Sequence, residues 1–113
     1  MSSSITTHIL DTSLGRPAQG VEVTLEMETS AGWETLGRGT SDADGRVSNL
    51  LAAGQLVPAT YRLRFATGPY FLARRVVSFF PQVEITFLVQ DAKQHYHVPL
   101  LLNPFGYTSY RGS

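Results

Sequence analysis

Histidines supply the side chains of this sequence that are best suited to proton transfer. His95 and His97 are two residues apart in the apolar run 95–102, so alternation along a strand places both on one face. The other face is the natural core face and carries Val98, Leu100 and Leu102. We therefore expect both imidazoles to point outward, where a ring that titrates near neutral pH can act as a general acid or base.

A third histidine lies in the first predicted strand, residues 5–10. If Ile5 and Ile9 face the core, alternation turns His8 outward as well, and the imidazoles could converge if the two strands share a sheet. The spacing of His95 and His97 also suits zinc, but a zinc site needs three or four ligands, and only His8 could be added by convergence. We expect no bound metal. A lone histidine can equally be a surface residue or a hydrogen-bonded structural residue.

An arginine and the C-terminus complete the set of candidates. Arg46 follows the Asp-Gly turn at 44–45, and its planar fork suits a carboxylate or carbonyl group, although it could also be a solvated residue at the start of a strand. The last ten residues are rich in aromatics, which is unusual for a chain end. Tyr107 and Tyr110 could anchor this end as an edge strand and so fix Arg111 and the terminal carboxylate of Ser113; the alternative is a last strand that simply packs well.

The elements that must position these residues are mostly strands. Apolar and polar residues alternate through 21–28, 61–65 and 83–89, and β-branched or aromatic residues enrich 5–10, 33–36 and 95–102. Turn residues separate these runs, and the only helix candidate is a short one at about 69–75. The pattern predicts an all-β fold, an antiparallel β-sandwich of seven to eight strands with one short helix.

Composition limits the function classes. The chain has 113 residues, enough for one domain spanning 1–113, and is 42% hydrophobic, which argues against disorder. Lys plus Arg is 9 and Asp plus Glu is 9, so the basic surplus of a nucleic-acid binder is missing. Without cysteine there is no disulfide and no thiolate nucleophile. We see neither a secretory signal nor a membrane span, and we expect a cytoplasmic protein.

Several segments together resemble the transthyretin-like proteins. Residues 5–18 resemble the first strand and turn of that family, 40–46 its arginine-bearing segment, and 79–81 and 95–101 its later strands. The ending Tyr-Arg-Gly-Ser at 110–113 matches the tetrapeptide that marks the branch of the family that hydrolyses 5-hydroxyisourate. Thyroid-hormone carriers of the same fold lack this ending, so the match favours a hydrolase.

The resemblance implies a transthyretin/prealbumin-like sandwich that assembles as a homotetramer, a dimer of dimers with its sites at the dimer–dimer interface. It implies hydrolysis of 5-hydroxyisourate to 2-oxo-4-hydroxy-4-carboxy-5-ureidoimidazoline in urate catabolism, by water attack on a lactam bond and without a cofactor. The alternatives are a non-catalytic small-ligand carrier of the same family and a prealbumin-like interaction module.

The family's functional residues fall on positions already singled out. By resemblance the catalytic set is His8, Arg46, His97 and Ser113, and the substrate-binding set is His8, Arg46, Tyr110 and Arg111. Either His8 or His97 could take the first proton from water, and Ser113 could act through its hydroxyl or its carboxylate. His95 is expected to support the site rather than to touch the substrate.

Overall fold

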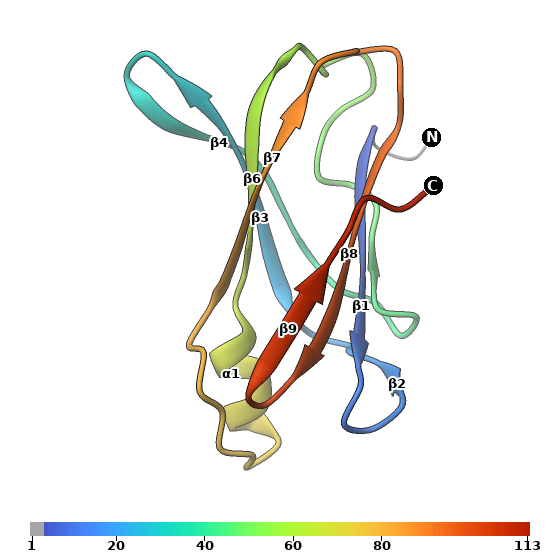
Figure 1. Cartoon of the computed structure of the whole chain (residues 1–113), viewed down its shortest axis with the longest axis vertical. Coiled ribbons are helices and arrows are strands. Elements are labelled where there is room, and N and C mark those ends of the chain that lie inside the picture. The colour runs from blue at the N-terminus through green and yellow to red at the C-terminus, as the bar shows by residue number, and fades with distance from the viewer. Residues whose placement is uncertain (1–3) are drawn as a thin grey trace.

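Two β-sheets packed face to face form this protein, seen in a computed structural model that describes residues 4–113 (Figure 1). Residues 1–3, which belong to the N-terminal stretch judged for a secretory signal, lie outside the described residues. The first sheet has the strand order β2-β1-β8-β9, with β5 paired to β1. Its strands are β1 (Ile5–Asp11), β2 (Arg16–Pro17), β5 (Arg46–Val47), β8 (Tyr96–Asn103) and β9 (Gly106–Ser109).

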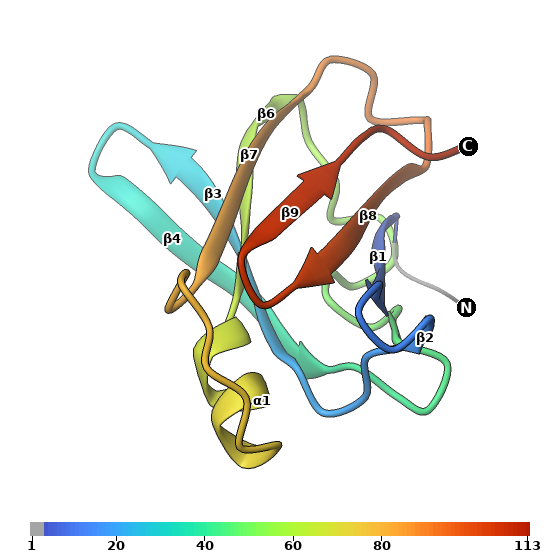
Figure 2. The same ribbon diagram turned by 60° about the horizontal axis from the view of Figure 1, so that its bottom comes forward.

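The second sheet has the order β4-β3-β6-β7, and a short helix follows its third strand along the chain. Its strands are β3 (Glu22–Thr29), β4 (Gly32–Thr40), β6 (Ala59–Phe65) and β7 (Val83–Val89), and the helix is α1 (Thr67–Ala73). Figure 2 shows α1 beside the end of the sandwich, next to the second sheet. The predicted all-β sandwich with one short helix is confirmed.

One strand pair departs from the expected antiparallel arrangement. β1 and β8 run parallel, whereas the other strand pairs between residues 4 and 113 are antiparallel. A parallel pair needs a long crossover rather than a tight turn. Here the crossover consists of the whole chain between the two strands, which builds the second sheet and also adds the short strands β2 and β5 to the first.

The core forms where the alternating residues of the two sheets meet. The largest fully buried side chains include Tyr61, Phe65, Phe71, Ile5, Ile9 and Leu25. β4 runs from Gly32 to Thr40 and is longer than the predicted 33–36, because it is an edge strand whose mostly exposed residues give little hydrophobic signal. The predicted 83–89 strand coincides with β7, and the other predicted strands agree to within a few residues.

The helix begins two residues earlier than the sequence indicates. It starts at Thr67, so Pro69 lies in the first turn, where its missing N–H breaks no intrahelical hydrogen bond. It ends at Ala73, and Arg75 follows in a left-handed conformation with φ of 59°. Within the described residues no helix has the length and apolar character required to cross a membrane.

A buried hydrogen bond ties this helix to the first strand. Asp11 is 1% exposed on the core face of β1, and the hydroxyl of Tyr70 donates to its Oδ2 at 2.7 Å. The other carboxylate oxygen accepts from the backbone N–H and the hydroxyl of Ser13. Burial, followed by the adjacent Asp11, raises the pKa of Tyr70 to about 12. This contact joins the two layers at the lower end of the sandwich.

Replacing Tyr70 by Phe should lower the free energy of unfolding by about 2 kcal/mol, since the lost hydrogen bond has a charged acceptor. Tyr61→Phe is the control with neutral partners only: the Tyr61 hydroxyl donates at the same 2.7 Å to the carbonyl of Val57 and accepts from the Val57 N–H at 3.1 Å, and we expect a loss of about 1 kcal/mol. Urea unfolding at pH 7 and one fixed protomer concentration measures both values. If Tyr61→Phe lost more stability than Tyr70→Phe, the charged Asp11 acceptor would not be the stronger partner that we expect.

The same bond has a signature at alkaline pH. The pKa of Tyr70 is about 12 in the folded protein, against about 10 for an ordinary tyrosine, so its stabilising effect is complete below pH 10. That effect is lost as the pH rises from 10 to 12. The free energy of unfolding of Tyr70→Phe should therefore fall less steeply over this interval than that of the wild type.

Candidate active site

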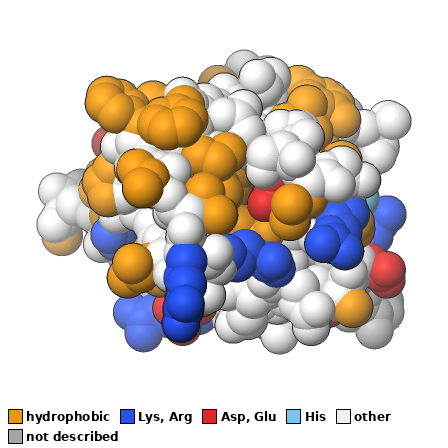
Figure 3. Space-filling model, turned by 90° about the horizontal axis from the view of Figure 1, so that it is seen from below, with side chains coloured by type: hydrophobic (Ala, Val, Ile, Leu, Met, Phe, Trp, Pro, Cys, Tyr) orange, Lys and Arg blue, Asp and Glu red, His pale blue; other side chains and the backbone are white. Residues whose placement is uncertain are grey.

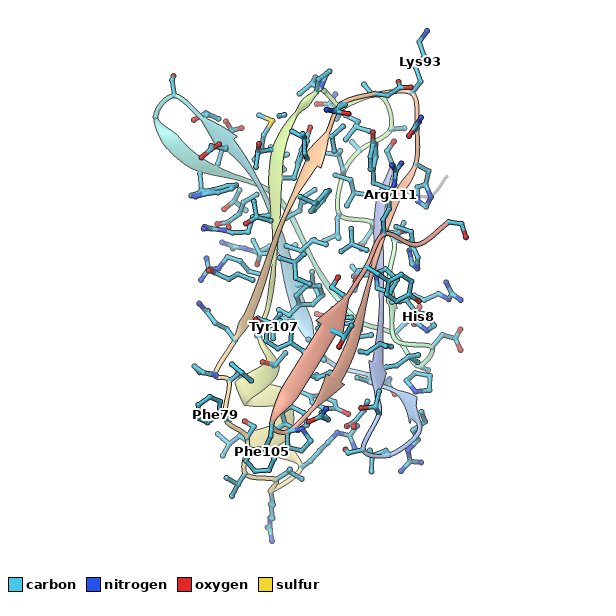
Figure 4. All side chains as sticks on the ribbon, in the orientation of Figure 1. His8, Phe79, Lys93, Phe105, Tyr107 and Arg111 are labelled. Carbon is cyan, nitrogen blue, oxygen red and sulfur yellow. The ribbon has the colours of Figure 1, made fainter. Side chains whose placement is uncertain are left out.

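The outer face of the first sheet gathers the predicted histidines and the arginine. In the pairing of β1 with β5, His8 lies opposite Arg46, and in the pairing of β1 with β8, Thr6 lies opposite His97. Residues paired across strands point to the same side of a sheet. The prediction that His8 and His97 point outward from strands of one sheet is therefore confirmed, and Figure 4 shows His8 on the side turned away from the second sheet.

A hollow of about 290 Å³ opens on this face. It is lined by Thr6, Thr7, Arg46, Val47, Ser48, His95, His97 and Ser113. Three of the predicted site residues thus meet at one place, from β5, β8 and the C-terminus. His8 lies beside the hollow through its pairing with Arg46 rather than in its lining.

His97 is the most constrained of the three histidines. Its Nδ1 lies 2.8 Å from Oγ1 of Thr6, and its ring stacks with that of His95 at 6.4 Å between centroids. Burial is the main reason that the pKa of His97 is lowered, and positive charge on His8, His95 and Arg46 lowers it further. At neutral pH His97 is therefore uncharged, the form in which an imidazole accepts a proton.

The C-terminal segment is held against His97 by its backbone. The N–H of Gly112 donates to the carbonyl oxygen of His97 at 2.8 Å, which brings Ser113 to the wall of the hollow. A Cβ on Gly112 would come within 2.7 Å of Cδ2 of His97, so only glycine permits this approach. Ser113 is thereby held in the same hollow as the Arg46 guanidinium and the imidazoles of His95 and His97.

The two other residues of the terminal tetrapeptide lie elsewhere. Arg111 donates to Oε1 of Gln94 at 2.8 Å and lies over the ring of Tyr96, 4.6 Å from its centroid. Arg111 and Tyr110 line a separate, mainly apolar pocket of about 220 Å³ between the edges of the two sheets. Extended backbone sends successive side chains to opposite sides, so Arg111 turns away from the side where Gly112 meets His97. Figure 4 shows His8 and Arg111 at separate places on the first sheet.

Within a single chain, Tyr110 and Arg111 therefore do not join the substrate-binding group expected for them. Arg111 instead fixes the segment that carries Ser113.

The sequence analysis gave no role to Thr6, although this residue lies two positions before His8 and so shares its face of the strand. Its importance comes from its pairing with His97, which only the parallel register of β1 and β8 shows. Within residues 4–113, no group of three or more His, Cys, Asp or Glu side chains is arranged to hold a metal ion.

Comparison with known proteins gives consistent matches over nearly the whole chain. The sequence model of the HIUase/Transthyretin family matches residues 5–112. The 5-hydroxyisourate hydrolase of Salmonella typhi is 44% identical over 112 residues, covering 99% of this chain and 82% of that protein.

Solved structures agree with the sequence matches. The structure of Klebsiella pneumoniae 5-hydroxyisourate hydrolase superposes with a TM-score of 0.84 at 38% identity, covering 96% of this chain and 98% of that one. Sea bream transthyretin, solved in complex with thyroxine, superposes with a TM-score of 0.91 at 31% identity, covering 96% of this chain and 94% of that one.

Proposed function

The chain belongs to the HIUase/Transthyretin family, and we propose that it is an enzyme that hydrolyses 5-hydroxyisourate in urate catabolism. The observation that carries this proposal is the hollow in which His97, Arg46 and Ser113 meet on the outer face of the first sheet. Sequence similarity to 5-hydroxyisourate hydrolases, which extends over nearly the whole chain, supports the same substrate. The product is 2-oxo-4-hydroxy-4-carboxy-5-ureidoimidazoline, and the reaction consumes one water molecule.

Water attack needs a base, and His97 is the residue that we assign to it. The lowered pKa keeps this ring uncharged at neutral pH, so a ring nitrogen can take a proton as the water oxygen bonds to the lactam carbonyl carbon. The carbon–nitrogen bond then breaks, and the leaving nitrogen takes up a proton. His8, beside the hollow, is the second group that we assign to proton transfer.

Negative charge develops on the carbonyl oxygen during this attack, and Arg46 is the group placed to stabilise it. Arg46 lines the hollow with His97, and a guanidinium offers positive charge together with a fork of N–H donors. Ser113 supports the reaction by orienting an imidazole, through its hydroxyl or its carboxylate. Arg111 anchors the C-terminal segment through its hydrogen bond to Gln94. Tyr110 is 56% exposed, and we propose that it binds substrate only in the assembled oligomer.

Removing either histidine should slow turnover without unfolding the protein. Because one positioned acid or base contributes about 10²–10⁴-fold, His97→Ala and His8→Ala should each lower kcat by about that factor. The measurement is the ultraviolet decay of 5-hydroxyisourate generated from urate, with circular dichroism as the check on folding. Wild-type protein that leaves this decay unchanged would favour the carrier alternative, and full activity in both variants would refute the assignment of the histidines.

The close approach of Gly112 gives a second test. Gly112→Ala should push the terminal segment away from His97, and misplacement of this kind can lower kcat/KM by about 10²-fold. Gly106→Ala is the matched control in the same C-terminal hairpin, because its added Cβ would meet only the side chain of Asn103 at 3.6 Å. If both variants keep the wild-type kcat/KM in the ultraviolet assay, the position of Ser113 is irrelevant to catalysis.

We also propose that the protein is a homotetramer, a dimer of dimers with sites at the dimer–dimer interface. Hydrophobic side chains gather on the end of the molecule seen in Figure 3. Figure 4 places Phe79 and Phe105 at this end, where they are 69% and 68% exposed. Val77 is also 79% exposed. β7 and β9 are each the last strand of a sheet, and such an edge strand can pair with a strand of another chain. These features support self-association.

The cytoplasmic location expected from the sequence stays a prediction.

Sedimentation equilibrium should give the wild type a mass four times that of the 12.4 kDa chain. Phe79→Glu should reduce this mass, because a charge placed in an apolar contact opposes its burial. Lys93→Glu is the control, since Lys93 is exposed at the opposite end of the molecule in Figure 4. A wild-type mass of 12.4 kDa at micromolar concentration would refute the tetramer.

A further inference from the structure

Thr6 lies between two of the three histidines. Its Oγ1 is 2.8 Å from Nδ1 of His97 and 3.1 Å from Nε2 of His95, and the residue is only 9% exposed. The contact with His97 follows from the parallel register, in which Thr6 is its direct partner. The two imidazole rings stack with only 19° between their planes, so one hydroxyl reaches both.

A hydroxyl has one proton to donate, which links the two rings. If Thr6 donates to His95, it must accept from Nδ1–H of His97, and the Nε2 of His97 then keeps its lone pair. If Thr6 donates to Nδ1 of His97, the proton of that neutral ring lies on Nε2, and His95 must donate from its own Nε2. The first arrangement makes His97 a base at Nε2, whereas the second makes it a donor there.

We propose that Thr6 is a positioning residue for the reaction, whose hydroxyl holds neutral His97 with its proton on Nδ1 and makes this tautomer depend on the protonation of His95. The catalytic role of Thr6 rests on the proposed function. The hydrogen-bond arrangement itself concerns the resting protein and can be measured without substrate.

The coupling has a definite direction with pH. Uncharged His95 can accept at Nε2 and so supports the base form of His97. When His95 takes up a proton, its Nε2 must donate to the Thr6 oxygen, which frees the Thr6 proton. In the proposed coupling that proton is then donated to Nδ1 of His97, so the proton of neutral His97 moves to Nε2 and the base nitrogen is lost. Among the described residues, the other charged or titratable groups that act on His97 are His8 from β1 and Arg46 from β5, and Ser113 of the terminal segment lines the same hollow; none of the three is among the hydrogen-bond partners of the Thr6 hydroxyl.

Nitrogen-15 NMR of the histidine rings tests the arrangement directly, because a protonated ring nitrogen and one with a lone pair have well-separated chemical shifts. At pH 8 we expect His97 of the wild type to carry its proton on Nδ1, and to move it to Nε2 as His95 becomes protonated. Thr6→Ser keeps the hydroxyl and should keep both features. Thr6→Val has nearly the same shape without the hydroxyl and should lose them.

Wild-type His97 with its proton on Nε2 at pH 8, or the same tautomer behaviour in the wild type and in Thr6→Val, would overturn the proposal. His95→Ala provides a second route if Thr6→Val does not fold, since it removes the partner that drives the exchange. In this variant the move from Nδ1 to Nε2 on acidification should vanish, and its persistence would likewise overturn the proposal.

Kinetics then connects the hydrogen bond to catalysis. Thr6→Val should lower kcat/KM by about 10-fold, a factor typical for the loss of one hydrogen bond, and Thr6→Ser should restore most of it. The acidic limb of the pH profile should lie at lower pH in His95→Ala than in the wild type. Equal kcat/KM in the wild type and Thr6→Val, with the tautomers as expected, would overturn the catalytic role of Thr6. A wild type that does not hydrolyse 5-hydroxyisourate would refute the proposed function and leave the NMR result intact.

Discussion

The parallel pairing of β1 with β8 is the constraint on which the candidate site depends. Its register runs from Ile5 opposite Tyr96 to Asp11 opposite Leu102 and places Thr6 directly against His97. A shift by one residue would turn the side chains of one strand to the opposite face. His8 would then leave the outer face and Ile9 would leave the core. The buried apolar residues of β1 and β8 thus fix the geometry of the polar face.

The sequence was sufficient to predict most of the longer strands and the faces of β1 and β8, but not the two-residue strands β2 and β5. Alternation identified Val98, Leu100 and Leu102 as core residues, and all three are buried, with His97 on the opposite side. It did so because a half-buried strand leaves a local, period-two pattern. Edge strand β4 was predicted too short, since its exposed residues carry little of that pattern.

Contacts between segments distant in the chain were not predictable in the same way. Nothing local in residues 5–11 indicates a parallel partner ninety residues later, so the position of Thr6 between two histidines could not be anticipated. The ending at 110–113 was recognised by resemblance as one unit, yet its residues divide between two faces. Gly112 pairs with the backbone of His97, while Arg111 lies over Tyr96. Such a division depends on tertiary packing.

Burial and nearby positive charge give His97 and its surroundings two properties that the proposed reaction needs. Burial first, and then the charges of the neighbouring histidines and Arg46, lower the pKa of His97, which keeps the ring available as a base. The same guanidinium favours the negative charge that develops on the substrate oxygen during attack. A carboxylate placed directly on His97, as in a serine-hydrolase triad, would raise its pKa and would favour the imidazolium instead. A neutral hydroxyl can orient the ring without this effect, and Thr6 occupies that position.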